Sequence, residues 1–277
     1  MFEQRKIDSH CHVLDPQRFA YASDVAYQPQ GQEIGTADYF THVMAAYGVQ
    51  HALLVGPNSG YGLDNRCLLD AIAQGAGRFK GIAVLADDTP SERLQELQAQ
   101  GIVGVAFNVS LHGVAYYQHI EPLLQRMAAL GLWAQFQVEA DQLVELMPMI
   151  GRTQVPVLID HCGRPRLSDG LQAPGVQALL ALGRSGQAVV KISGYAKFSQ
   201  QLFPFDDVDA HVAQLVQAFG MSRCIWASDW PYLKAPYRLD YGTLLKRAAR
   251  SFQPHELQQL MWDNPQRLFQ FESNVLA

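Results

Sequence analysis

Three histidines and one aspartate stand at the ends of apolar runs that lie far apart in the sequence. His10 and His12 close the first run, His161 follows a run that ends at Asp160, and Asp229 follows a third. In a strand, side chains two positions apart point to the same face, so His10 and His12 would lie about 6.6 Å apart along it. Imidazole and carboxylate groups accept protons, form hydrogen bonds and bind metal ions. The pattern predicts a single site built from three strands.

The elements that must bring these residues together alternate regularly along the chain. Apolar, partly β-branched runs alternate about eight times with segments whose apolar residues recur at helical spacing, without a long linker. Eight such units predict an α/β fold, a (β/α)8 TIM barrel, as a single domain over 1–277. The predicted strands are 6–13, 50–56, 81–86, 103–109, 132–138, 155–160, 188–193 and 224–228. The predicted helices are 38–47, 65–75, 91–100, 120–130, 142–150, 176–184, 206–219 and 241–251.

A closed barrel also accounts for where the candidate residues fall. Catalytic groups of (β/α)8 barrels gather at the carboxyl ends of the strands, and the three histidines and Asp229 occupy such ends. An open doubly wound sheet would need a glycine-rich phosphate turn, and no G-x-G-x-x-G follows the first predicted strand. We therefore prefer the closed barrel.

The composition argues against several classes of partner. With 277 residues, 48% hydrophobic and 17% charged, the chain can bury a large core, and a formal net charge of -5 gives no footprint for nucleic acid or an anionic membrane. The four cysteines lack C-x-x-C spacing, and no run approaches ~18 apolar residues. We expect no leader segment, because the residues before the first predicted strand form no apolar stretch. We expect a cytoplasmic protein with a small-molecule substrate, and homo-oligomer formation stays open.

Four motifs together resemble the amidohydrolase superfamily over essentially the whole chain. The resemblance is to its branch of predicted metal-dependent hydrolases, which includes 2-pyrone-4,6-dicarboxylate lactonase and sugar lactonases. The motifs are Asp8-Ser9-His10-Cys11-His12, Asp160-His161-Cys162-Gly163-Arg164-Pro165, Ser228-Asp229-Trp230-Pro231 and, in an expected terminal helix, Asn264-Pro265. Singly they are unspecific, but together they imply an amidohydrolase-type barrel.

The resemblance implies a hydrolase that opens a lactone, a cyclic ester. Attack of water on the lactone carbonyl places negative charge on its oxygen, so hydrogen-bond donors must be aimed there. We expect His10, His12 and His161 to polarise this carbonyl and Asp229 to act as general base. Once protonated, Asp229 would return its proton to the departing ring oxygen, so no covalent intermediate is needed.

A metal ion is permitted by these residues but not required by them. His10, His12, His161 and Asp229 form a plausible set for one Zn or Mn ion, which would lower the pKa of bound water to ~7. Binuclear members of the superfamily place a Lys, Glu or Cys on strand four, and the run from Gly104 to Asn108 offers none. We expect no two-metal site and no obligatory metal.

Substrate recognition depends on a second set of residues. Arg164 is the clearest candidate for a carboxylate clamp, because a guanidinium engages a carboxylate in bidentate fashion, although a structural role for this arginine is the alternative. Dicarboxylate lactonases carry an arginine where Ala106 stands here and a further one where His112 stands. Pyrone dicarboxylate itself is therefore in doubt, and a monocarboxylate muconolactone-type ring or a neutral sugar lactone remains open. The other substrate-binding candidates are Tyr27 in the long first loop, Asn108, His112 and Lys197.

Two other functions stay in view. A metal-dependent decarboxylase of the same superfamily would use the same four residues around zinc, and metal dependence and CO2 release would distinguish it. A catalytically silent binding protein on a barrel scaffold is the third hypothesis, since a fold does not fix a function. The intact set of three histidines and Asp229 argues against the silent protein.

Overall fold

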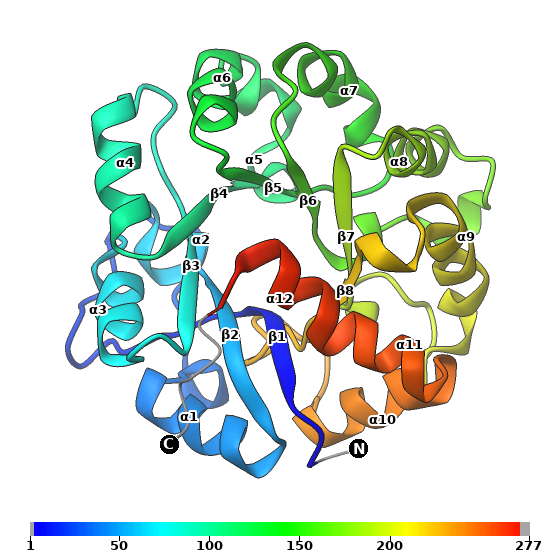
Figure 1. Ribbon diagram of the computed structural model, residues 1–277, viewed down its shortest axis with the longest axis horizontal. Coiled ribbons are helices and arrows are strands. Elements are labelled where there is room, and N and C mark those ends of the chain that lie inside the picture. Colours follow the sequence, from blue (N-terminus) through cyan, green and yellow to red (C-terminus); the bar gives the residue numbers. More distant parts are fainter. Residues whose placement is uncertain (1–2, 272–277) are drawn as a thin grey trace.

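The computed structural model describes residues 3–271, and eight parallel strands form a barrel at its centre (Figure 1). Each strand pairs with the next in chain order, and the barrel closes where the Asp229 amide donates to the His10 carbonyl at 2.9 Å. The strands are β1 Lys6–Cys11, β2 Val49–Val55, β3 Phe79–Ala83, β4 Ile102–Asn108, β5 Trp133–Gln137, β6 Val157–Ile159, β7 Ala188–Ile192 and β8 Cys224–Trp226. The predicted barrel and all eight predicted strands are confirmed.

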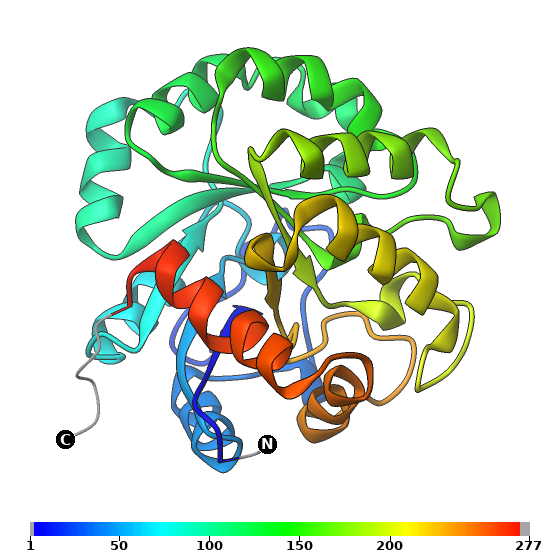
Figure 2. The same ribbon diagram turned by 45° about the vertical axis from the view of Figure 1, so that its right-hand side comes forward.

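The predicted helices form a ring around the barrel, as both ribbon views show (Figures 1 and 2). They are α1 Ala37–Ala46, α3 Arg66–Gln74, α4 Ser91–Ala99, α6 Glu121–Ala129, α7 Gln142–Thr153, α8 Pro174–Ser185, α9 Asp209–Phe219 and α10 Tyr241–Ser251. Within residues 3–271 there are four shorter helices besides these eight: α2 Asn58–Tyr61, α5 Val109–His112, α11 Pro254–Gln258 and α12 Asn264–Phe269, the last of which is the expected terminal helix. Within residues 3–271, no helix has both the length and the apolar character needed to cross a membrane.

The C-terminal segment closes one end of the barrel. A π-helical turn, Gln259–Asp263, joins α11 to α12. The segment formed by these three elements lies across one end of the barrel (Figures 1 and 2). Its aromatic side chains pack with buried residues from inside the barrel as one apolar cluster. The cluster comprises Ile7, Leu53, Val55, Ile82, Leu158, Val189, Ile225, Trp262, Phe269 and Phe271. The barrel interior is therefore a packed floor at this end, and the site can open only at the other.

Above this floor the inward-facing positions become polar. Side chains alternate between the two faces of a strand, so Val189 of the floor is followed on the same face of β7 by Lys191. Lys191 is fully buried, as are Gln135 of β5 and Asp160, which follows β6. This buried polar layer separates the apolar floor from the carboxyl ends of the strands, where the candidate residues lie.

Candidate functional site

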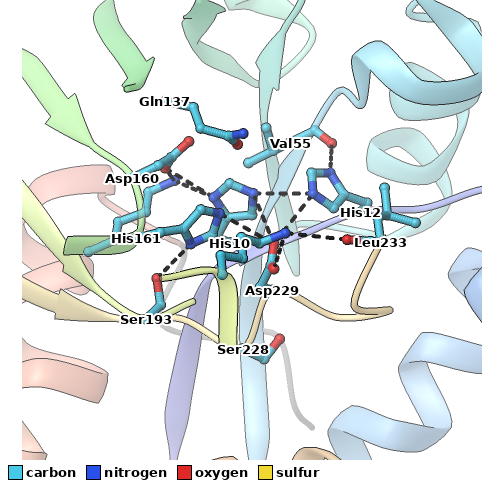
Figure 3. Close-up of polar contacts among 12 residues, drawn as sticks. His10, His12, Val55, Gln137, Asp160, His161, Ser193, Ser228, Asp229 and Leu233 are labelled. Carbon is cyan, nitrogen blue, oxygen red and sulfur yellow. Dashed lines mark hydrogen bonds and ion pairs between the residues drawn. The ribbon is translucent and has the colours of Figure 1, made fainter. Parts of the chain in front are cut away.

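The three histidines and the aspartate predicted to form one site do converge (Figure 3). The Oδ1 atom of Asp229 lies 3.7 Å from Nε2 of His10, 3.7 Å from Nε2 of His12 and 3.5 Å from Nε2 of His161. The two Nε2 atoms of His10 and His12 are 3.2 Å apart. All four residues are buried. One carboxylate oxygen therefore faces three imidazole nitrogens that come from opposite sides of the barrel.

Asp229 is positioned by an anchor between β1 and the end of β8. The Asp8 carboxylate accepts hydrogen bonds from the Ser228 amide at 2.9 Å, from the Ser228 hydroxyl at 2.5 Å and from the Tyr241 hydroxyl at 2.8 Å. The same carboxylate also accepts from the His10 amide at 3.2 Å. Asp8 therefore ties the backbone of His10 to the residue that precedes Asp229.

Strained backbone on the loop after β6 places the third histidine. His161 and Cys162 have φ values of +50° and +57°, in the left-handed region that non-glycine residues seldom occupy. Opposite them Gly194 has a φ of +67°, and a Cβ atom built there would lie 2.6 Å from the His161 ring. The His161 Nδ1 atom forms a hydrogen bond with the Ser193 hydroxyl at 3.1 Å. The ring of His161 thus fits only because position 194 has no side chain.

The protons of the histidines are assigned from their hydrogen-bond partners. Nδ1 of His12 lies 2.8 Å from the Val55 carbonyl oxygen, which only accepts, so this nitrogen carries the proton. The Nε2 atom of neutral His12 therefore presents a lone pair to the site. The expected role of His12 in polarising the lactone carbonyl therefore has a condition. His12 can donate to the carbonyl oxygen from Nε2 only when both of its nitrogens are protonated.

Charge in the site is set by burial and by neighbouring groups. Burial, followed by the nearby Lys191 ammonium, lowers the pKa of His10 to about 4. Burial likewise holds the pKa of His161 well below its usual value. Burial alone would raise the pKa of Asp229, but Lys197, His161 and His12 outweigh it and hold this pKa well below its ordinary value. Near neutral pH the site therefore combines an ionised carboxylate with neutral His10 and His161.

A pocket of about 440 Å³ opens directly onto this group. Of the residues predicted to bind substrate, Asn108, Arg164 and Lys197 line the pocket. Tyr27 and His112 are not among its lining residues. The Tyr27 hydroxyl donates to Glu33, and the exposed His112 stacks on Tyr116 with 4.6 Å between the ring centres. The volume suits a small organic molecule.

The cations of the pocket already have partners in the protein. Arg164 donates to the Ser110 hydroxyl at 2.9 Å and pairs with the half-exposed Glu139 carboxylate at 3.0 Å. Lys197 lies 2.9 Å from Oδ2 of Asp229, so it acts on the candidate base as well as lining the pocket. Lys234, which the sequence analysis missed, lines the mouth with its ammonium 4.6 Å from the centre of the Tyr27 ring. The positive charge around the pocket is thus partly compensated.

The other residues that sequence reasoning missed lie deeper or on the far wall. Gln137 donates to the side chains of Asn108 and Ser110 at 3.3 and 3.0 Å, and Lys191 contacts His10 and Asp160. A signal was present for some of them. Lys191 interrupts the apolar run Ala188–Ile192, and Gln135 and Gln137 alternate with apolar residues in β5. Residues at two-residue spacing in a strand share one face, and polar side chains that are buried on such a face need partners.

The donor atoms also fit one divalent metal ion. His10, His12 and Asp229 each offer a ligand atom, and these atoms lie within 4.8 Å of one another. Within residues 3–271, Nε2 of His161 and Oδ1 of Asp229 are buried without a hydrogen-bond partner. Three histidines and one aspartate form a ligand set that zinc accepts. Neither β4 nor β5 contributes a Lys, Glu, Cys or His, as expected from the sequence.

Comparisons with known proteins agree with the motifs. The family model for amidohydrolases matches residues 7–271. A 4-sulfomuconolactone hydrolase of Hydrogenophaga intermedia is 29% identical over 275 aligned positions, which cover 95% of this chain and 88% of that protein. A 2-pyrone-4,6-dicarboxylate hydrolase of Comamonas testosteroni is 28% identical over 286 positions, with coverages of 95% and 89%.

A solved structure gives the same relationship in three dimensions. It is a hydrolase of Acinetobacter baumannii named for 2-pyrone-4,6-dicarboxylic acid, with citric acid bound. It superposes with a TM-score of 0.86 at 28% identity and covers 97% of this chain and 100% of its own. By its motifs, its barrel and the match over residues 7–271, this chain belongs to the amidohydrolase family.

Proposed function

We propose that this protein is a hydrolase that opens the ring of a small anionic lactone. The observation that carries the proposal is the ionised Asp229 carboxylate, which faces three imidazoles at the end of a pocket of about 440 Å³. The relatives named above are lactone hydrolases, which supports the same chemistry. The proposal includes one domain over 1–277. It also includes a cytoplasmic location, which the four free, buried cysteines support.

The reaction needs one group that takes a proton and later returns it. As the oxygen of a water molecule bonds to the lactone carbonyl carbon, Asp229 accepts a proton from that water. The carbonyl oxygen becomes an oxyanion, for which His10, His161 and Lys197 are the nearby donors. The ring C–O bond then breaks, and Asp229 returns the proton to the departing oxygen. The product is an open-chain hydroxy acid.

We propose that this chemistry does not require a metal ion. Were Zn²⁺ or Mn²⁺ present, His10, His12, His161 and Asp229 would hold it, and it would supply Lewis-acid polarisation of the carbonyl. The carboxylate already has the protonation state of a base, because the pKa of Asp229 lies far below neutrality through Lys197, His161 and His12 despite its burial. The steps assigned to Asp229 therefore need only the side chains of this chain.

The pocket supports a substrate with one anionic group rather than two. Arg164 lines the pocket but shares its charge with Glu139, and Lys197 shares its charge with Asp229. Ala106, also in the lining, offers no charge. The ammonium of Lys234, at the mouth, lies against the Tyr27 ring and forms no ion pair with a carboxylate of residues 3–271. We propose a monoanionic lactone, bound between Arg164 and Lys234, as the substrate class.

The experiment is a comparison of ring-opening rates across lactones of different charge. Chelator-treated protein is mixed with dicarboxylate, monocarboxylate, sulfonated and sugar lactones, and proton release is followed. The proposal predicts turnover of singly charged lactones, unchanged after zinc or manganese is added back. No turnover of any lactone even with metal restored would overturn it, and CO2 release from a carboxylated substrate would establish a decarboxylase instead.

A further inference from the structure

We propose that Lys191 determines which nitrogen of His10 carries its proton, so that His10 acts as a hydrogen-bond donor rather than as a ready metal ligand. Lys191 is fully buried on β7, beneath the site. Its ammonium lies 3.1 Å from Nδ1 of His10, on the side of the ring that faces away from Asp229. This is a positioning role, because Lys191 does not line the pocket.

The contacts of the Lys191 ammonium favour an unprotonated Nδ1 on His10. A lysine ammonium has three N–H donors and no acceptor. Around Lys191 lie Oε1 of Gln135 at 2.5 Å, Oδ1 of Asp160 at 3.0 Å and Nδ1 of His10 at 3.1 Å. The three donors are matched by three acceptors only if Nδ1 of His10 is unprotonated. A proton on that nitrogen would set two N–H groups against each other in a fully buried place, which is costly.

The opposite edge of the ring supplies a second and independent argument. Nδ1–H of His12 donates a hydrogen bond to the Val55 carbonyl, so Nε2 of the neutral His12 ring is an acceptor. Nε2 of His10 lies 3.2 Å from it, and this hydrogen bond exists only if His10 is the donor. Figure 3 shows the chain of contacts from Val55 through His12 to His10. Both edges of the ring therefore place the proton of His10 on Nε2.

Asp160 could instead accept a hydrogen bond from a protonated Nδ1 of His10, because its Oδ1 also lies 3.1 Å from that nitrogen. This carboxylate is satisfied without His10, because Oδ1 accepts from Lys191 and Oδ2 accepts from Gln135 at 2.9 Å. Without the lysine, Asp160 would be the natural acceptor for a proton on Nδ1, and Nε2 would become a lone pair. Lys191 thus selects between two forms of the same imidazole.

This selection affects how readily the site takes a metal. A histidine binds a metal ion through an unprotonated nitrogen. In the form held by Lys191, Nε2 of His10 carries a proton, so metal binding requires that proton to move to Nδ1 and the lysine to lose an acceptor. Lys191 therefore weakens metal binding and supplies the Nε2–H donor that lactone opening uses. Only the use of that donor rests on the proposed function.

The direct test is the tautomer of His10 in the metal-free wild-type protein. Long-range 1H–15N NMR spectra of ¹⁵N-histidine-labelled protein distinguish the two tautomers, and His10→Gln identifies the signals. The proposal predicts a protonated Nε2 on His10 in the wild type and a protonated Nδ1 in Lys191→Met. A protonated Nδ1 on His10 in the wild type would overturn it, whatever the catalytic activity of the protein.

The second readout is zinc affinity, measured by competition with a chromophoric chelator. Lys191→Met should bind zinc about tenfold more tightly than the wild type, the change expected for one hydrogen bond of about 1.4 kcal/mol. Lys6→Met is the matched control, because Lys6 is a buried lysine of β1 bonded to the carbonyls of Gln4 and Tyr47, remote from His10. Equal affinity in all three proteins would overturn the proposal. If Lys191→Met does not fold, the tautomer of His10 in the wild-type protein still decides the proposal, because a protonated Nδ1 there would overturn it.

Discussion

Asp229 is held ionised by its neighbours although it is buried. Burial raises the pKa of this carboxyl, and the Lys197 ammonium, 2.9 Å from Oδ2, is the strongest of the groups that lower it. A general base must be unprotonated at the working pH, so Lys197 is expected to set the acid limit of activity. The lysine therefore contributes to catalysis through the charge of the base as well as through the pocket wall.

Replacing Lys197 should shift the pH dependence of the reaction. In Lys197→Met the pKa of Asp229 rises, so the acid limb of the kcat/KM profile should move upward by roughly one pH unit or more. Lys234→Met is the control, since Lys234 also lines the pocket but contacts Tyr27 rather than Asp229. Unshifted acid limbs in both variants would show that Lys197 does not control the base.

Arg164 is expected to act in substrate binding. Arg164→Met removes the guanidinium that faces the pocket beside Ser110. KM for anionic lactones should rise by roughly tenfold or more while kcat changes little, and neutral lactones should be spared. Steady-state kinetics on a charged and a neutral lactone distinguish the cases. An equal loss on both would assign Arg164 a structural role through Glu139.

The sequence predicted the convergence of the four site residues but not the residues around them. His10, His12, His161 and Asp229 were identifiable because each stands at the end of an apolar run. Lys191 and Gln135 stand inside such runs, and strand alternation tells which side a residue faces only once the register is known. Tyr27 and His112 were predicted from loop position and family correspondence, and neither lines the pocket.

At the scale of elements, the strand ends explain how the site is built. The strands β6 and β8 span only three residues each and are shorter than predicted, so Asp160 and Ser228 lie beyond them. His161, Cys162 and Asp229 then adopt positive φ values. Helix and strand patterns carry no sign of such strain in non-glycine residues. The elements were therefore predictable, whereas the turns that aim the catalytic side chains were not.

Gly194→Ala tests whether the His161 ring must be held in its present position for catalysis. In Gly194→Ala the new Cβ would lie 2.6 Å from the His161 ring, so the ring must move, and kcat should fall by roughly a hundredfold. Gly131→Ala is matched in strain, with a φ of +68° against +67°, but has no atom within 4 Å of its Cβ. Both variants should lose the stability that a positive φ costs, and Gly194→Ala should lose more in thermal unfolding because of the added contact with the His161 ring. Equal kcat values in the two would contradict the crowding argument.

At the scale of the molecule, the buried titratable groups link stability to pH. The pKa of His10 is lowered by burial from 6.5 to about 4, and burial also lowers that of His161. Between pH 6.5 and about 4, these two histidines bind protons in the unfolded chain but not in the folded chain. Their contribution to the free energy of unfolding is therefore fully present above about pH 6.5 and is lost as the pH drops toward 4. Asp8 opposes this trend, because burial raises its pKa.

The net expectation is a loss of roughly 1 kcal/mol in the free energy of unfolding for each pH unit below about 6.5. Urea unfolding at pH 7.5, 6 and 5 measures it. In His10→Gln the dependence should be shallower, because one of the two neutral histidines is gone. A free energy of unfolding that is constant between pH 7 and 5 would contradict the assignment of neutral, buried histidines.

The closed barrel and its cover at one end could be predicted from the sequence only in part. The eight-fold alternation predicted the barrel, and the motif around Asn264 predicted a terminal helix. That this segment would cover the barrel floor with Trp262, Phe269 and Phe271 was not foreseen. The packing of this segment against the barrel depends on contacts between the two ends of the chain. No local sequence pattern reports such contacts.

If Asp229 takes the proton from water during lactone opening, Asp229→Asn should stop the reaction. The amide keeps the shape of the side chain but cannot accept that proton. On the lactone that the wild type opens fastest, we predict a fall in kcat of at least about a thousandfold, with the lactone still bound in an equilibrium titration and the fold intact. A kcat close to that of the wild type in this variant would show that Asp229 is not the general base.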